Sequence, residues 1–230
     1  MSRIVAGNAR GRRLVMPAGR DTRPTSDRVR EALFTSLEAS TGSIAGLAFL
    51  DLYAGSGAVG AEALSRGARP VWLVERARAA AETIRRNLST LGDSRQHATV
   101  RAQSVRSVLS GSAPQPFDVV FLDPPYAVSA ESLAEVLRLL RRSDWLAVDA
   151  IVVVERASRD GFEWPDGFTA DRERRYGDTT LWYGGPADAR IGGFAGSDPG
   201  SDPGGGTDVG TGVDGSERSD DRSAEQEGEA

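Results

Sequence analysis

Residues 119–126 join a short apolar run to a stiff turn, and together they restrict the folds open to this chain. Val119 to Leu122 has the length and composition of a strand buried on both faces, as in a parallel sheet. The Asp123-Pro124-Pro125-Tyr126 turn that follows lacks two backbone donors and is rich in oxygen acceptors beside one aromatic ring. An exocyclic amine on a planar base needs such acceptors and a ring to stack on. The alternative is a rigid strand-to-loop turn with an incidental tyrosine.

A glycine-rich loop follows a second apolar run, Leu47 to Leu50. It reads Asp51-Leu52-Tyr53-Ala54-Gly55-Ser56-Gly57 and precedes a helical pattern. Strand, glycine loop and helix in this order begin a nucleotide-binding βαβ unit. Gly55 and Gly57 allow the backbone to pass close to a ligand, because neither has a Cβ atom. With Gly60 they also satisfy GxGxxG, so a dinucleotide site is an alternative.

Asp51 discriminates between the two classes of cofactor. An acid four residues before the first glycine suits a cationic ligand and is unfavourable beside a pyrophosphate. S-adenosylmethionine carries an ammonium and a sulfonium, whereas NAD carries neither. Glu75 ends the next predicted strand, Val71 to Val74, and is placed to bond ribose hydroxyls of either cofactor.

In order and spacing, these residues resemble the class of S-adenosylmethionine-dependent methyltransferases that modify amine nitrogens. The resemblance implies that the loop residues line the methionine part of the cofactor and that Glu75 holds the ribose; the loop residues are Asp51, Tyr53, Ala54, Gly55, Ser56 and Gly57. In this class an acid often follows the third strand, here Ala98 to Arg101, near the adenine. This chain has Ser104 at that position. The Ser104 or Gln103 side chain, or the Val105 backbone, is the expected replacement.

Composition excludes several kinds of chemistry. The chain has no Cys, which excludes disulfides, thiolate metal sites and methylation of pyrimidine C5 through an attached thiolate. Its single His97 lies in a polar stretch and is expected at the surface, so no metal is expected. No apolar run is long enough to span a membrane and no basic-then-apolar signal begins the chain, which predicts a soluble cytoplasmic protein without a membrane partner.

Charge divides the chain into a basic beginning and an acidic end. The first 30 residues hold eight Arg against two Asp, a net +6. Ile4 to Gly7 and Gly11 to Val15 predict two short strands around Asn8. An arginine-lined hairpin can bind phosphates. The alternative is a solvated basic edge strand that only prevents aggregation. The candidate RNA contacts are Arg10, Arg12, Arg13, Arg23 and Arg28.

The acidic end is predicted to be disordered. From Pro186 onward the chain has 11 acidic residues and 3 arginines, a net charge of −8. The segment is also rich in Gly and poor in aromatic residues. We therefore divide the chain into a basic hairpin extension at 1–22, a catalytic domain at 23–185 and a disordered tail at 186–230. Thr25 or Ser26 is expected to cap a helix that buries Val29, Leu33, Phe34 and Leu37.

Four segments together resemble a narrower family. "RIVAGNARGRRL", "TRPTSDRVREALF", "DLYAGSGAVGAEALSRGA" and "DPPY" are similar to the RsmD family of 16S rRNA guanine-N2 methyltransferases, over roughly residues 3–184. The resemblance implies a Rossmann-like class I methyltransferase with an N-terminal β-hairpin extension. It implies that the substrate is one guanine of 16S rRNA in a partly assembled small ribosomal subunit. We expect the protein to be a monomer. The acidic tail does not fit the family pattern.

The predicted elements form an α/β fold. After the N-terminal extension the order is βαβαβαβαβ, which indicates a mostly parallel sheet. A C-terminal hairpin around Gly177-Asp178 is expected to add an antiparallel edge. The expected helices lie near 58–66, 77–91, 104–110 and 129–142, and the fifth strand at Ala150 to Glu155.

For the guanine that the resemblance implies, we expect direct methyl transfer to an extruded base, because N2 is not free for in-line attack inside a helix. Tyr126 is expected to stack on the base, while Asp123 and the Pro124 carbonyl accept the N2 hydrogens. A DNA adenine-N6 or cytosine-N4 methyltransferase is one alternative, since this turn serves any exocyclic amine. A non-catalytic RNA-binding assembly factor is another. A dehydrogenase is a distant third, and protein-glutamine methyltransferases more usually have Asn at the position of Asp123.

Overall fold

The computed structural model describes residues 2–16 and 27–188 of the 230-residue chain. In this part a seven-stranded sheet has the order β5-β4-β3-β6-β7-β9-β8. Its strands are β3 (Phe49–Leu52), β4 (Val71–Val74), β5 (Ala98–Arg101), β6 (Phe117–Leu122), β7 (Leu146–Ala157), β8 (Phe168–Tyr176) and β9 (Thr179–Pro186). The strands from β3 to β7 are parallel, and β9 and β8 add antiparallel pairs. The predicted α/β class and Rossmann-like sheet are confirmed.

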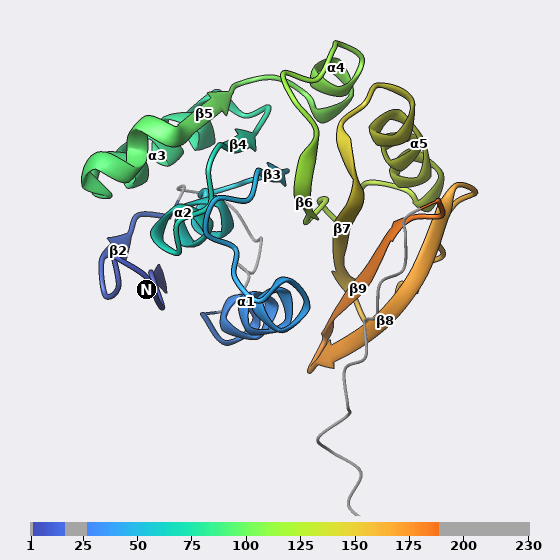
Figure 1. Ribbon diagram of the computed structural model, residues 1–230, viewed down its shortest axis with the longest axis horizontal. Coiled ribbons are helices and arrows are strands. Elements are labelled where there is room, and N and C mark those ends of the chain that lie inside the picture. Colours follow the sequence, from blue (N-terminus) through green and yellow to red (C-terminus); the bar gives the residue numbers. More distant parts are fainter. Residues whose placement is uncertain (1, 17–26, 189–230) are drawn as a thin grey trace, which may run out of the picture. The chain divides into compact units, whose positions relative to one another are not determined.

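Helices cover both faces of this sheet (Figure 1). One core cluster takes apolar side chains from α1 (Asp27–Thr41), α2 (Ala58–Ser65) and α3 (Arg78–Ser89). The other takes them from α4 (Val105–Leu109) and α5 (Ala130–Arg142). A short 3-10 helix, η1 (Gly92–His97), precedes β5. As predicted, α1 buries Val29, Leu33, Phe34 and Leu37; the proposed caps Thr25 and Ser26 lie outside the described residues.

Strand β3 ends later than the sequence predicts. It runs from Phe49 to Leu52, so Asp51 lies inside the strand and pairs with Leu73 on one side and Phe121 on the other. Phe49 and Leu50 belong to opposite core clusters, which is the alternation of a strand buried on both faces. The carboxylate of Asp51 is therefore held at a fixed position by two neighbouring strands.

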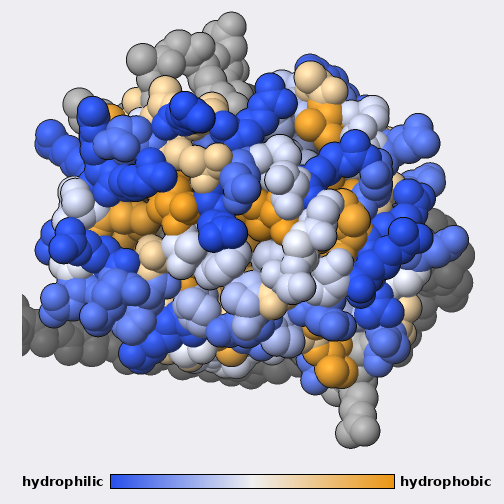
Figure 2. Space-filling model, turned by 90° about the horizontal axis from the view of Figure 1, so that it is seen from above, coloured by the Kyte–Doolittle hydropathy of each residue, from blue (hydrophilic) through white to orange (hydrophobic). Residues whose placement is uncertain are grey.

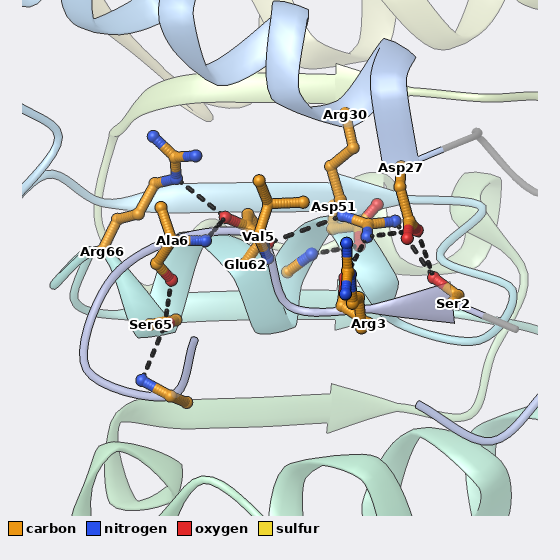
Figure 3. A network of polar contacts seen from close by, with 12 residues as sticks. Ser2, Arg3, Val5, Ala6, Asp27, Arg30, Asp51, Glu62, Ser65 and Arg66 are labelled. Carbon is orange, nitrogen blue, oxygen red and sulfur yellow. Dashed lines mark hydrogen bonds and ion pairs between the residues drawn. The ribbon is translucent and has the colours of Figure 1, made fainter. Parts of the chain in front are cut away.

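The N-terminal hairpin is built differently from the prediction. Its strands are only β1 (Ser2–Arg3) and β2 (Arg13–Leu14). The strand predicted from Ile4 to Gly7 is therefore not formed, and the one predicted from Gly11 to Val15 is reduced to Arg13–Leu14. The reason is that helix α2 takes the turn's backbone donors. The Glu62 carboxylate accepts hydrogen bonds from the N–H groups of Val5 at 2.7 Å and Ala6 at 2.9 Å (Figure 3).

The C-terminal hairpin is confirmed, and its second strand extends one residue past the predicted boundary at 185. Strand β9 includes Pro186, and the Asp188 carboxylate pairs with Arg141 at 2.9 Å. Residues 187 and 188 therefore contact the segment before β8 and helix α5. The rest of the predicted tail lies outside the described residues.

Few large hydrophobic side chains are exposed on the surface of the described residues. In the view of Figure 2, hydrophobic residues lie in a broken band bordered by hydrophilic ones. Within residues 2–16 and 27–188, the large hydrophobic residues that are strongly exposed are Val15, Tyr126 and Val148. No helix of this part is long and apolar enough to cross a membrane. The same residues hold no group of three or more His, Cys, Asp or Glu side chains able to bind a metal ion.

Candidate active site

A cavity of about 600 Å³ lies at the carboxyl ends of β3, β4, β6 and β7. Its position follows from the strand order. The chain runs outward from β3 to β4 and β5 and then returns to place β6 on the other side of β3. The loops after β3 and β6 therefore separate, and such a switch point is where open α/β sheets bind ligands.

The loop after β3 is strained at one non-glycine residue. Tyr53 has a φ of 62°, a conformation that costs about 1–3 kcal/mol outside glycine, and it lines the cavity. Gly55 and Gly57 also have positive φ, at 57° and 75°. The Ala54 N–H donates to the Val74 carbonyl at 3.0 Å, and the Gly57 N–H donates to the Ala54 carbonyl at 2.7 Å. The first bond attaches the loop to β4, and the second forms a turn directly before helix α2.

Asp51 is the most buried acid of the site. The residue is 1% exposed, and its Oδ2 accepts a hydrogen bond from the Gly60 N–H at 2.9 Å. Burial raises the pKa of Asp51 to about 8; the hydrogen bond from Gly60 opposes this rise, and the charges of Asp123 and Glu75 add to it. Without a cation nearby, Asp51 is therefore protonated at neutral pH.

Glu75 joins the glycine loop to the end of β4. Its carboxylate accepts hydrogen bonds from the Gly55 N–H at 3.0 Å and the Ala77 N–H at 2.8 Å. The residue is 3% exposed and lines the cavity. Asp51, Glu75 and Asp123 thus give the cavity three acidic groups from three adjacent strands.

The turn after β6 forms the opposite wall. Asp123, Pro124, Pro125 and Tyr126 all line the cavity. The Val128 N–H donates to the Pro125 carbonyl at 2.8 Å, and Arg156 donates to the Val128 carbonyl at 3.0 Å, which fixes the turn. The Tyr126 residue is 61% exposed, so its ring is accessible for stacking. The Arg159 guanidinium lies 5.9 Å from the centre of that ring.

The structure brings most of the predicted site residues into one cavity. Those in its lining are Asp51, Tyr53, Ala54, Ser56, Glu75, Asp123, Pro124, Pro125 and Tyr126. Gly55 approaches the cavity through its bond to Glu75 without being part of the lining. Gly57 also lies outside the lining; its positive φ favours glycine, and a Cβ atom there would lie 3.0 Å from Ile84 and 3.1 Å from Leu73. Its contact with the cofactor stays a prediction.

Ser104 and Val105 lie outside the cavity lining. Ser104 caps helix α4, where its hydroxyl accepts a hydrogen bond from the Ser107 N–H at 3.1 Å. Val105 is buried in the second core cluster. Local structure therefore accounts for both residues, and their contact with an adenine stays a prediction.

Sequence reasoning missed the part of the cavity that β7 and the β8–β9 turn supply. Glu155 and Arg156 come from β7, and the segment from Tyr176 to Thr179 comes from the turn. Sequence reasoning also missed Met16, which follows the N-terminal hairpin. One signal was present: Glu155 ends the apolar run Ala150 to Val154, as Asp123 follows its own apolar run. The turn residues carried no such signal, because only the fold brings them to this edge.

The candidate RNA contacts lie on the N-terminal segment. Arg10, Arg12 and Arg13 are exposed on the hairpin, and Arg28 is exposed on α1. Arg23 lies outside the described residues. Met16, which follows the hairpin, lines the cavity, whereas Arg10, Arg12 and Arg13 do not. The Asn8 N–H and the Ala9 N–H bond to Ser65, so the turn beside Arg10 is attached to the C-terminal end of α2.

A buried ionic network attaches the hairpin to α1 and α2 (Figure 3). Arg30 is fully buried; it donates to Asp27 at 2.9 Å and lies 3.6 Å from Glu62. Glu62 also accepts a hydrogen bond from Arg66 at 2.9 Å. The hairpin is therefore fixed to the helix that follows the glycine loop.

Comparisons with known proteins agree with this architecture. A family model described as "Conserved hypothetical protein 95" matches residues 2–185. The chain is 39% identical over 176 residues to the Ribosomal RNA small subunit methyltransferase D of Haemophilus influenzae, covering 76% of this chain and 89% of that one. It is 38% identical over 173 residues to the protein of the same name from Escherichia coli K12, covering 75% and 83%. The solved structure of the Escherichia coli protein yhhF superposes with a TM-score of 0.70 at 35% identity, covering 80% of this chain and 97% of that one.

Proposed function

The chain belongs to the RsmD family of methyltransferases, and from this premise we propose that it transfers a methyl group from S-adenosyl-L-methionine to N2 of one guanine in 16S rRNA. Two relatives named as small-subunit rRNA methyltransferases support the rRNA substrate. The single observation that carries the chemistry is that the acidic groups of β3 and β4 and the acceptor turn after β6 line the same cavity.

The residues of the cavity fit S-adenosyl-L-methionine. Asp51 and Glu75 are acids at the ends of adjacent strands, and carboxylates suit a sulfonium and an ammonium group. The raised pKa of Asp51 also supports a cationic ligand, because a buried carboxyl keeps its proton until a cation beside it stabilises the ionised form. When bound, the cofactor supplies an electrophilic methyl group. We assign Asp51 to its cationic part and Glu75 to its ribose.

The acceptor turn positions the guanine amine. Asp123 and the Pro124 carbonyl accept the two N2 hydrogens, which aims the nitrogen lone pair at the methyl group. Tyr126 stacks on the extruded base through its exposed ring. Such alignment can contribute about 7–11 kcal/mol to lowering the barrier. Asp123 does not need to be a strong base, since the nitrogen becomes acidic only as it gains the methyl group.

We assign the N-terminal hairpin extension, residues 1–22, to holding the rRNA beside the domain of residues 23–185. Exposed Arg10, Arg12 and Arg13 supply the positive charge that phosphates attract. The proposed substrate is a partly assembled small subunit, and the proposed active form is a monomer.

Methyl transfer from labelled S-adenosyl-L-methionine tests this function. The acceptors are small subunits from cells that lack the protein, naked 16S rRNA and duplex DNA, followed by nucleoside analysis and mapping of the product. We expect N2-methylguanosine at one position of the rRNA. N6-methyladenine or N4-methylcytosine in the DNA, or no transfer to any acceptor despite cofactor binding, would overturn the proposal.

A further inference from the structure

Glu155 occupies a position beside Asp123 that the proposed chemistry does not use. Leu122 pairs with Val154 on adjacent parallel strands, so Asp123 and Glu155 are the next residues on β6 and β7. Neighbouring strands lie about 4.8 Å apart, and side chains at matched positions point to the same face. Both residues line the cavity. Two carboxylates thus stand side by side at the wall where the base is proposed to enter.

The sheet holds Glu155 rigidly. On its other side it pairs with Leu181 of β9, so strands flank it on both edges. The residue is only 7% exposed, although it faces the cavity. A group held on a rigid strand can impose geometry on a ligand.

A row of acceptors matches the Watson–Crick edge of guanine. Guanine presents the N1–H donor directly beside its N2 amine, so an acceptor for N1–H must lie next to the acceptors for N2. Adenine and cytosine instead place a lone pair beside the exocyclic amine. A carboxylate at that position would attract guanine and repel the other two bases, and buried polar groups that lose their partner discriminate strongly.

We propose that Glu155 determines base specificity by accepting the N1–H of the target guanine while Asp123 and the Pro124 carbonyl accept the N2 hydrogens. This inference rests on the proposed function. It assigns the cavity wall of β7 to recognition of the base and the turn after β6 to positioning of the reacting nitrogen.

The test is Glu155→Gln, because the amide keeps the size of the side chain and adds a donor that can pair with adenine N1. Subunits are prepared with the natural guanine or with adenine at the mapped target nucleotide. The unchanged protein should methylate only the guanine subunits. For E155Q we expect the rate on guanine relative to that on adenine to fall by about 10- to 100-fold, with N6-methyladenosine formed on the adenine subunits.

Three controls separate the possible results. Glu173→Gln changes an exposed glutamate of β8 outside the cavity lining and should keep the unchanged protein's selectivity. Glu155→Asp keeps the acceptor and should keep guanine selectivity at a lower rate, so the inference stays testable if E155Q folds poorly. Calorimetry should show unchanged affinity of E155Q for S-adenosyl-L-methionine.

The outcomes distinguish this inference from the function on which it rests. If the unchanged protein makes N2-methylguanosine and E155Q has the same guanine-to-adenine ratio, Glu155 does not read the base and the inference is wrong. A loss of rate on the guanine subunits with no N6-methyladenosine on the adenine subunits, together with a lower melting temperature, would also overturn it, because that is the signature of a purely structural role. If the unchanged protein makes no N2-methylguanosine, the proposed function itself fails.

Discussion

The charge of Asp123 acts on Asp51 across two adjacent strands of the sheet. Asp51 pairs with Phe121 of β6, and Asp123 lies two residues further along the same strand direction. Burial is the main cause that raises the pKa of Asp51 to about 8, and the Asp123 carboxylate adds to it. The group assigned to the cofactor and the group assigned to the substrate amine are therefore electrostatically coupled.

The first prediction concerns the pH dependence of cofactor binding. Below about pH 8 Asp51 is protonated in the free protein, and a cation beside it favours the ionised form, so binding releases a proton. The affinity for S-adenosyl-L-methionine should therefore rise with pH by up to about tenfold per unit, and level off above pH 8. Titration calorimetry between pH 6 and 9, in buffers of different ionisation enthalpy, measures both the affinity and the proton release. Asp51→Asn should flatten this slope while keeping any titration that belongs to the cofactor, and an unchanged slope in D51N would contradict the assignment.

The same pKa makes a prediction about stability. The folded protein keeps the Asp51 proton up to about pH 8, whereas the unfolded chain releases it near the ordinary value of 3.8. The folded state thus binds more protons between these two values, and its stability falls as pH rises through that window. Asp51→Asn removes this loss and can still accept the Gly60 hydrogen bond. Between pH 5 and pH 8, the melting temperature of the unchanged protein should fall more than that of D51N; equal changes would show that Asp51 ionises normally in the fold.

A third prediction separates substrate positioning from cofactor binding. Asp123→Ala removes an acceptor of the N2 hydrogens, so turnover should fall by about 100-fold or more. It also removes a charge that raises the pKa of Asp51, so the pH midpoint of cofactor binding should move down and affinity at pH 7 should not weaken. Single-turnover methylation and calorimetry measure the two effects. A collapse of cofactor affinity in D123A would place Asp123 in the cofactor site instead.

The sheet and most of the cavity could be predicted from local patterns in the sequence. Apolar runs that end in Asp123 and Glu75 marked the carboxyl edge, and parallel strand order brought those ends together. The roles of Gly57 and Glu62 could not be predicted in this way. A side chain at Gly57 would meet Ile84 and Leu73, and Glu62 binds the turn of the hairpin 56 to 57 residues away, so both depend on tertiary packing.

The short strands of the hairpin could not be predicted either, because they too depend on tertiary packing. Residues such as Ile4 and Val15 have β propensity, which predicts longer strands, but propensity is overridden when another element takes the backbone donors. Here Ser65 also accepts a hydrogen bond from the Ala9 N–H at 3.0 Å. No periodicity in the first 16 residues indicates that helix α2 would provide these acceptors.

A fourth prediction tests how the hairpin is attached. Glu62→Gln would remove a fully buried carboxylate that pairs with Arg66 at 2.9 Å and lies 3.6 Å from Arg30, which keeps Asp27 as a partner. Removing one partner of a buried ion pair costs about 3–5 kcal/mol. Denaturant unfolding should show this loss. The matched control is Glu82→Gln, whose partner Arg85 lies on the exposed face of α3, and it should cost about 1 kcal/mol or less. Equal effects of the two changes would mean that the network in Figure 3 contributes little to stability.

The last prediction concerns the charge of the hairpin rather than its attachment. Changing Arg10, Arg12 and Arg13 together to Gln removes three exposed cations of the hairpin. Affinity for small-subunit rRNA should fall, and its dependence on salt should flatten by about one unit of slope for each phosphate that is no longer neutralised. The control is Arg138→Gln with Arg142→Gln on α5, which covers the opposite face of the sheet and should leave the slope unchanged. Filter binding across a range of salt concentrations measures both slopes. The three arginines form none of the buried interactions of the network, so the triple variant should keep its melting temperature and its affinity for S-adenosyl-L-methionine. Equal slopes in the triple variant and the α5 control would assign RNA binding to another surface.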